Sequence, residues 1–197
     1  MKIFLVNEIF RKLLHIFSSI IPIGYYFFIK NQNVMIGILF ILTIIALIIE
    51  YSRNKWSFPK KIFNNYFFSM LRKSEYEGYL TGATWLLVGC ILTIYIFPIE
   101  IAVAAILVLT IGDALAAIIG KSFPVLKVGE KSLFGTFFGV LVTFWMLVLL
   151  DIGLKWEIIL IGSIFGMLVE LIPNYLNDNL TIPIASGFAM MLGLQIL

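Results

Sequence analysis

Residues 111–136 read IGDALAAIIGKSFPVLKVGEKSLFGT, and this stretch places an aspartate inside an otherwise apolar segment. An ionised carboxylate in hydrocarbon is costly, so Asp113 needs a cation, a polar cavity or a proton. Three lysines follow it closely, namely Lys121, Lys127 and Lys131. An acidic side chain that faces a basic loop suits a cation-assisted phosphate site. We therefore expect Asp113 to have a functional role.

The composition indicates an integral membrane protein. Of the 197 residues, 61% are hydrophobic and only 13% are charged. A soluble domain is typically about 45–50% apolar and about 25% charged. No polar segment is long enough to form a separate domain, so residues 1–197 are expected to form one membrane-embedded domain. Cys90 is the only cysteine, which argues against a disulfide framework and a cysteine-based metal site.

The apolar runs predict an all-α, polytopic protein with about seven transmembrane helices and one interfacial amphipathic helix. Within the polar region 51–79, apolar side chains keep helical spacing between basic residues, which is typical of a helix in the interface plane. Pro98 ends the third span, and Pro183 and Gly187 lie within the seventh. The expected spans are residues 13–29, 34–49, 81–97, 99–120, 132–150, 156–172 and 180–197.

The basic residues divide unequally between the two sides of this topology. Of the fourteen Lys and Arg residues, only Lys30 and Lys155 fall on the side away from the N-terminus. Loops rich in Lys and Arg stay in the cytoplasm, so the N-terminus is expected there. Asp113, the 121–131 loop and the segment 170–179 fall on the same side. We therefore expect an active site that faces the cytoplasm.

Three polar patterns each have two interpretations. The charged side chains of segment 8–15 share one helix face, which fits either an interfacial anchor or a stripe facing an active site. Ser132 fits the N-cap of a helix or part of an anion site at that helix N-terminus. Segment 170–179, ELIPNYLNDN, fits a helix end with an Asn-rich turn or a source of ligands for a divalent cation.

Five motifs follow one another along almost the whole chain. They are Glu8, Arg11, Lys12 and His15 in an E-x-x-R-K-x-x-H pattern; Leu80-Thr81-Gly82-Ala83-Thr84; Asp113-Ala114-Leu115-Ala116 with Gly120-Lys121; Lys131-Ser132-Leu133 with Gly135-Thr136; and Glu170 with Asp178-Asn179-Leu180-Thr181-Ile182-Pro183. In this order they resemble the polyprenol/dolichol kinase and phytol kinase family, which is related to the membrane CTP-transferases.

The resemblance implies transfer of a phosphoryl group from CTP to the hydroxyl of a membrane lipid alcohol, with Mg²⁺ or another divalent cation as cofactor. The alcohol would be a polyprenol, a phytol-like alcohol or diacylglycerol. The expected partners are the nucleotide, this lipid and the bilayer, with no nucleic acid. By the same resemblance, the catalytic residues are Asp113, Lys131, Glu170 and His15; the nucleotide-binding residues are Lys121, Lys127, Lys131, Ser132, Gly135, Arg11 and Lys12; and the metal ligands are Asp113, Glu170 and Asp178.

Two residues depart from the family pattern in the expected nucleotide loop. Phe134 stands where an acidic residue is expected, and Pro124 stands where a glycine is common. These departures leave the nucleotide base open. Two other functions also stay open: a phosphatidate cytidylyltransferase that makes CDP-diacylglycerol and releases pyrophosphate, and a transporter or flippase that uses Asp113 and Glu170 as a relay.

Overall fold

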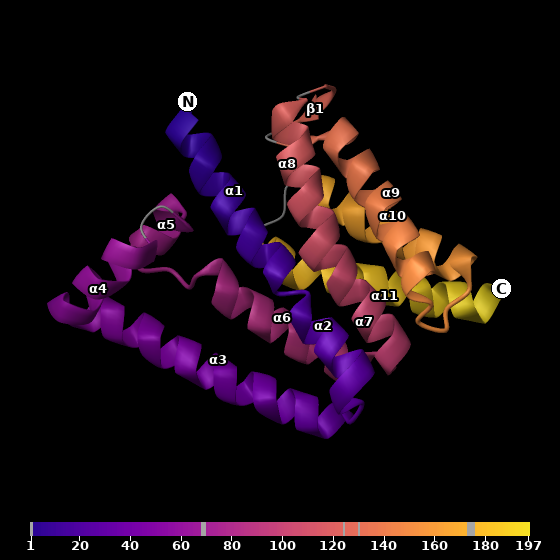
Figure 1. Cartoon of the computed structure of the whole chain (residues 1–197), viewed down its shortest axis with the longest axis horizontal. Helices are drawn as coiled ribbons and strands as arrows, with labels where there is room; N and C mark the ends of the chain where they lie inside the picture. Colours follow the sequence, from indigo (N-terminus) through magenta and orange to yellow (C-terminus); the bar gives the residue numbers. More distant parts are fainter. Residues whose placement is uncertain (1, 68–69, 124, 130, 173–175) are drawn as a thin grey trace.

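A computed structural model describes residues 2–67, 70–123, 125–129, 131–172 and 176–197, with only the backbone described for residues 2–8. Its regular structure consists of helices and one short antiparallel β-hairpin (Figure 1). The elements are α1 (Lys2–Phe17), α2 (Ile20–Gly24), η1 (Tyr25–Ile29), α3 (Gln32–Lys55), α4 (Ser57–Phe67), α5 (Lys73–Tyr76), α6 (Gly82–Ile96), α7 (Ile99–Leu107), η3 (Val108–Asp113), α8 (Ala114–Ser122), β1 (Lys127–Val128), β2 (Lys131–Ser132), α9 (Leu133–Leu150), α10 (Trp156–Leu171) and α11 (Asp178–Ile196).

The segments α7, η3 and α8 form one continuous helix, Ile99–Ser122, around which the other helices pack. Its most apolar window is 78% buried, against 22% for α3. Residues 101–109 are all buried, as expected for a helix that is apolar on every side and enclosed by other helices. α1 and α2 contact this helix from one side, while α9, α10 and α11 contact it from the other (Figure 1).

Five helices are long and apolar enough to cross a membrane, and they coincide with the first, second, fourth, fifth and seventh predicted spans. Their bounds are Ile9–Ile29, Gln32–Lys55, Ile99–Ser122, Leu133–Leu150 and Asp178–Ile196. The third and sixth predicted spans correspond to α6 and α10, which have 15 and 16 residues. A membrane-spanning helix needs about 20 residues, so the count of seven spans stays a prediction.

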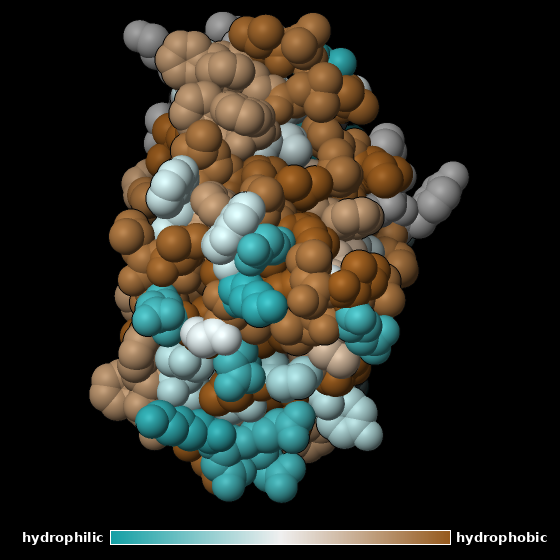
Figure 2. Space-filling view, turned by 90° about the vertical axis from the view of Figure 1, so that its right-hand side faces the viewer, coloured by the Kyte–Doolittle hydropathy of each residue, from teal (hydrophilic) through white to brown (hydrophobic). Residues whose placement is uncertain are grey.

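The surface of the protein is strongly apolar. Hydrophobic side chains cover most of the face in Figure 2, and hydrophilic side chains gather toward one end. The most exposed large apolar side chains include Phe28, Leu149 and Ile196, each more than four-fifths exposed. Contiguous apolar surface of this kind marks contact with lipid or with another protein, and with five long apolar helices it fits an all-α membrane protein.

Several local predictions are confirmed by the helix ends. α6 ends at Ile96, two residues before Pro98, and α7 begins directly after that proline. The Ser132 hydroxyl accepts a hydrogen bond from the Gly135 amide, so it caps α9 as predicted. α4 has no buried residue, and its location at the membrane interface stays a prediction. Pro124, Pro173 and Asn174 lie outside the described residues.

α8 and α9 approach each other closely where both carry glycine. A Cβ atom built on Gly135 would lie 2.9 Å from the Gly120 Cα atom and would also overlap the Ala116 carbonyl oxygen. Glycine therefore permits this crossing, which positions the start of α9 and the preceding strand β2 beside α8. Lys131 is the first residue of β2 and therefore lies close to this crossing, directly before α9 begins.

Candidate functional site

Asp113 is buried and is paired with a lysine from the N-terminal helix. The Lys12 ammonium donates a hydrogen bond of 2.6 Å to Asp113 Oδ2, and both residues are about 95% buried. Asp113 ends the π-helical turn η3, and such turns are frequent at functional sites. The sequence predicts that this acid needs a cation, a polar cavity or a proton, and the structure places the cation of Lys12 against it.

His15 lies beside the same carboxylate and is oriented by an asparagine. The Nδ1 atom of His15 lies 3.8 Å from Asp113 Oδ2, while Nε2 lies 2.9 Å from Asn179 Oδ1. Asn179 Nδ2 donates to the carbonyl oxygen of Gly82 at 2.7 Å, which turns its Oδ1 atom toward the histidine. The Nε2–H group of His15 therefore donates a hydrogen bond to Asn179 Oδ1, and in the described structure the buried Nδ1 atom has no hydrogen-bond partner.

Lys131 contacts two acidic residues that follow α9 in the chain, Glu170 and Asp178. Its ammonium donates to Asp178 Oδ2 at 2.9 Å and to the main-chain oxygen of Glu170, and it lies 3.6 Å from Glu170 Oε1. The Thr136 hydroxyl donates to Glu170 Oε2 at 3.1 Å. Burial lowers the pKa of Lys131, but Glu170, Asp178 and Asp113 together raise it by more, so the net pKa is raised and the lysine stays charged.

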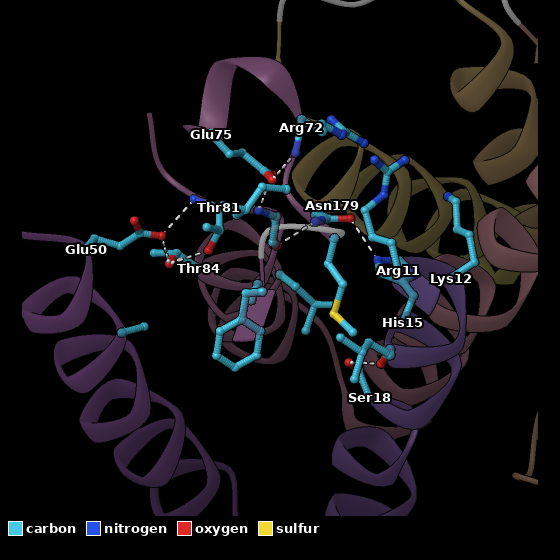
Figure 3. Close-up of a pocket in the computed structure, with 18 of the residues that line it drawn as sticks. Arg11, Lys12, His15, Ser18, Glu50, Arg72, Glu75, Thr81, Thr84 and Asn179 are labelled. Carbon is cyan, nitrogen blue, oxygen red and sulfur yellow. Dashed lines mark hydrogen bonds between the residues drawn. The ribbon is translucent and has the colours of Figure 1, made fainter. Parts of the chain in front are cut away.

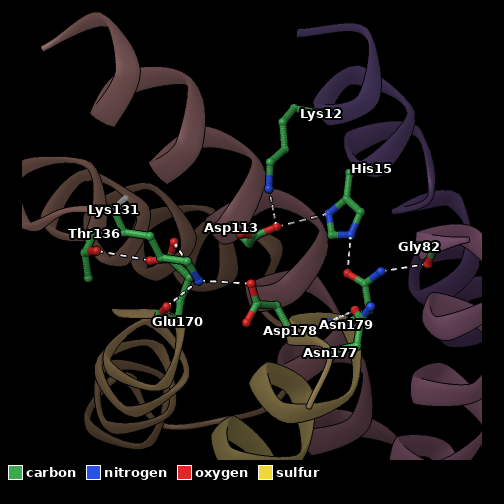
Figure 4. Close-up of polar contacts among 10 residues, drawn as sticks. All are labelled: Lys12, His15, Gly82, Asp113, Lys131, Thr136, Glu170, Asn177, Asp178 and Asn179. Carbon is green, nitrogen blue, oxygen red and sulfur yellow. Dashed lines mark hydrogen bonds and ion pairs between the residues drawn. The ribbon is translucent and has the colours of Figure 1, made fainter. Parts of the chain in front are cut away.

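The first two residues of α11 connect these two clusters. Asp178 contacts Lys131, while the next residue, Asn179, contacts His15 (Figure 4). We use the term polar row for Lys12, His15, Asp113, Lys131, Glu170, Asp178 and Asn179. The row combines three acids with two lysines, and each lysine is paired with at least one of the acids.

A cavity of about 300 Å³ opens beside the His15 end of the polar row. We call it the α1–α3 cavity (Figure 3). Lys12, His15, Asp113 and Asn179 lie at its polar end, together with Arg11. Its walls also include α3, α4 and the start of α6, through mostly apolar side chains such as Ala46, Ile49, Phe63, Phe67 and Leu86.

A second polar cluster, which the sequence interpretation missed, fixes the start of α6 against this cavity. Glu50 pairs with Arg53 at 2.5 Å and accepts hydrogen bonds from the Thr81 amide and the Thr84 hydroxyl. Glu75 accepts a hydrogen bond from the Gly82 amide at 2.8 Å. The sequence holds a signal for the local pair alone, because an acid and an arginine three residues apart end a long apolar run.

The remaining predicted site residues lie away from the polar row. Lys121 and Lys127 are exposed, at the end of α8 and in β1. Ser132 caps α9, and Gly135 lies at the crossing of α8 and α9. Their predicted contacts with nucleotide stay predictions.

The two departures from the family pattern fall in this region. Phe134 packs against Phe123 and Phe138, with ring centroids 6.1 and 4.9 Å away. At the position where the family pattern has an acid, this chain therefore has a phenylalanine that packs in an aromatic cluster. The side chain of Glu8, like Pro124, lies outside the description.

The oxygen donors of the polar row suit Mg²⁺, but only together with other ligands. Among the described residues, no three His, Cys, Asp or Glu side chains form a group that could hold a metal ion alone. Asp113 faces Lys12, and Glu170 and Asp178 face Lys131. Mg²⁺ is commonly held by one or two carboxylates plus substrate phosphates, and two of the three acids Asp113, Glu170 and Asp178 would be enough for a site of that type.

The fold and the polar row define an α-helical membrane protein with a buried lysine–carboxylate site. The chain belongs to the same family as the uncharacterized protein RP860 of Rickettsia prowazekii, with 32% identity over 187 residues that cover 89% of each protein. It is also similar to CTP-dependent diacylglycerol kinase 1 of Saccharomyces cerevisiae, with 27% identity over 93% of this chain and 72% of that protein. No family model and no solved structure matches the chain.

Proposed function

We propose that the protein is a CTP-dependent lipid kinase that transfers the γ-phosphoryl group of CTP to the hydroxyl of a membrane lipid alcohol. The distant similarity to CTP-dependent diacylglycerol kinase 1 supports a kinase of this general kind. It makes diacylglycerol the first acceptor to test, with polyprenols and phytol-like alcohols as the others. The cytoplasmic orientation expected from the basic residues would give the site direct access to nucleotide.

The observation that carries the proposal is the pairing within the polar row. Phosphoryl transfer depends mainly on positioning the reactants and on neutralising charge at the phosphates. Lys131 and Lys12 are the two lysines of the row that could bind phosphate oxygens. Each is now paired with a carboxylate, which could instead bind a divalent cation. The row therefore contains both elements of a nucleotide site, and they neutralise each other when no nucleotide is bound.

In the proposed reaction, the hydroxyl oxygen of the lipid forms a bond to the γ-phosphorus of CTP. The bond from that phosphorus to the β–γ bridging oxygen breaks, and CDP leaves with that oxygen. The hydroxyl proton passes to the His15–Asp113 pair. Asp113, with Glu170 or Asp178, would hold the divalent cation, which supplies charge neutralisation at the phosphates when bound. Lys131 and Lys12 would contact phosphate oxygens, and Asn179 would hold His15 in place.

Product analysis with two labelled nucleotides tests the proposal. The purified protein, in lipid with Mg²⁺, is given CTP labelled at either the γ- or the α-phosphate, with diacylglycerol, polyprenol, phytol and phosphatidate as separate acceptors. We expect the γ-label to enter a lipid alcohol and CDP to be released. The α-label in phosphatidate, with release of pyrophosphate, would instead identify a cytidylyltransferase.

ATP and GTP should be tested in parallel, because Phe134 leaves the nucleotide base open. Transfer from ATP alone would keep the kinase class and correct the donor. No label in any lipid with any of these nucleotides would contradict the proposal and favour the transporter interpretation, in which Asp113 and Glu170 form a relay.

A further inference from the structure

We infer that the α1–α3 cavity binds the head end of the lipid acceptor and leaves most of its chain in the bilayer. This inference rests on the proposed kinase function and adds the place at which the second substrate binds. Along the polar row, Asp113 lies between Lys131 and His15 (Figure 4). His15 and Asp113 both line the cavity, whereas Lys131 is not among its lining residues. Nucleotide at Lys131 and lipid in the cavity would therefore meet at Asp113.

The lining of the cavity matches an amphipathic ligand. One end holds the charged and amide groups of Lys12, His15, Asp113 and Asn179, which can position a hydroxyl. The opposite walls are formed mainly by aliphatic and aromatic side chains of α3 and α4. Three charged residues also line that side, namely Glu50, Arg72 and Glu75, and the two carboxylates are already hydrogen-bonded to the start of α6. Ligand pockets commonly combine mostly apolar walls with a few converging polar groups. A nucleotide, which is polar along its whole length, would leave these apolar walls unmatched.

The packing of the helices indicates where the chain of the lipid enters. α1 packs on α8 and η3, whereas α3 packs on α6 and α4, so the cavity lies between two helices held by different neighbours. Leu14 on α1 and Ile49 on α3 both line the cavity and are 49% and 46% exposed. Apolar side chains that are both lining and exposed mark an opening at the apolar surface, through which an acyl chain can pass.

The volume limits how much of the lipid the cavity holds. At about 30 Å³ for each water-sized group, 300 Å³ has room for about ten such groups. This space fits a polar head and the first methylene groups, and the rest of each chain must lie outside. The cavity should therefore select the acceptor by its head and be nearly indifferent to chain length.

Photo-crosslinking locates the lipid without requiring turnover. The probe is a diacylglycerol with a diazirine on a methylene group close to the glycerol, added to the full-length protein in vesicles without nucleotide. We expect labelled peptides from α1, α3, α4 and α6 around the cavity. Unlabelled diacylglycerol should reduce the labelling, and phosphatidate should compete less well. Labelling only of exposed apolar surface, such as the shallow groove on α9 that includes Leu141 and Trp145, would overturn the inference.

Cavity-filling variants connect the lipid site to catalysis. Ala46→Phe and Ile49→Trp add volume at the cavity wall and should raise KM for diacylglycerol about tenfold, the effect of overpacking a pocket. KM for CTP should not change, which also shows that each variant is folded. Leu149→Trp is the matched control, because Leu149 is 81% exposed on α9. Unchanged lipid KM in both cavity variants would overturn the inference while the kinase function stands.

Chain length provides a second, independent readout. Diacylglycerols with short and long acyl chains should have KM values within about threefold of each other, when KM is expressed as mole fraction in the vesicle. The reason is that only the head and the first methylene groups of either lipid enter the cavity. A steep increase in affinity with chain length would contradict a cavity that holds only the head. If no lipid is phosphorylated but the probe still labels the cavity, the kinase proposal fails and the lipid site remains.

Discussion

The Lys12 ammonium lies 2.6 Å from Asp113 Oδ2, and this buried ion pair connects α1 to the central helix across 101 residues of sequence. Removing one partner of a buried pair leaves an uncompensated charge and typically costs about 3–5 kcal/mol. Asp113→Asn should therefore lower the midpoint of thermal unfolding in detergent by several degrees. Asp151→Asn is the control, because Asp151 is exposed in a left-handed conformation that asparagine also adopts, and its midpoint should not change.

The double variant Lys12→Met/Asp113→Leu separates stability from function. Replacing both charges with apolar side chains removes the uncompensated charge, so most of the lost stability should return. Phosphoryl transfer should stay absent, because the proposed site has lost its acid. A double variant that unfolds as readily as Asp113→Asn would show that the ion pair is not what stabilises this contact. A double variant that transfers phosphate would remove Asp113 from the reaction.

The helices could be predicted from the sequence far better than the contacts between them. Apolar runs, Pro98 and the Ser132 cap act locally, so five predicted spans and two helix boundaries are found in the structure. Contacts such as His15 with Asn179 join residues 164 positions apart, and no local pattern specifies them. The charged face of segment 8–15 showed which side chains share a side. It could not show that Lys12 meets Asp113.

Lys131 is predicted to carry most of the affinity for nucleotide phosphate. Lys131→Met should raise KM for CTP by about ten- to hundredfold, the effect of losing one charge-assisted hydrogen bond. Lys127→Met should change it by about twofold or less, because Lys127 is exposed in β1 and an exposed charge interacts weakly. Equal effects of the two variants, measured by steady-state kinetics, would indicate that the basic loop acts only through its total charge.

The raised pKa of Lys131 predicts how nucleotide binding depends on pH. Nearby carboxylates raise the pKa of Lys131 in the folded protein above the pKa of an ordinary lysine. The side chain therefore loses its charge only when the pH rises above that raised pKa. CTP affinity should therefore be flat from about pH 7 to about pH 9, below the ordinary lysine pKa. A loss of affinity within that range that Lys131→Arg abolishes would show that Lys131 titrates there instead.

Divalent cation binding should depend on nucleotide, because lysines now occupy the carboxylates of the polar row. Mn²⁺ binding, followed by electron paramagnetic resonance, should be weak for the protein alone and should tighten when CTP is added. Asp178→Asn should weaken only the binding seen with CTP, since Asp178 lies against Lys131. Tight, stoichiometric Mn²⁺ binding without nucleotide would contradict this arrangement and indicate a metal site formed by the protein alone.

The crossing of α8 and α9 should not tolerate a side chain at Gly135. Gly135→Ala would place a methyl group against Gly120 and the backbone of Ala116, and overpacking of this kind costs about 1–3 kcal/mol. Gly37→Ala, on α3, is the control, because a Cβ there meets nothing within 4 Å. The control should be neutral or slightly stabilising in a thermal melt. Equal melting points for the two variants would show that the crossing is looser than described.

The cluster around Glu50 shows why part of the site could not be foreseen. Arg53 donates to the carbonyl oxygens of Glu75 and Tyr79, at 2.8 Å each, and these contacts bring a distant loop to the end of α3. The spacing of Glu50 and Arg53 predicts a local pair and gives no information about that loop. The position of α6 at the cavity wall depends on these long-range contacts.

The initial rate at which wild-type protein and Asp113→Asn transfer the γ-phosphoryl group of CTP to diacylglycerol, in vesicles with Mg²⁺, tests the central claim most directly. The proposal predicts transfer by the wild type and a loss of about 100-fold or more in the variant, since the site loses a charge that acts on the reacting groups. Asp151→Asn should transfer at the wild-type rate. Transfer by Asp113→Asn at the wild-type rate would contradict the assignment of the site, and no transfer by the wild type would contradict the function.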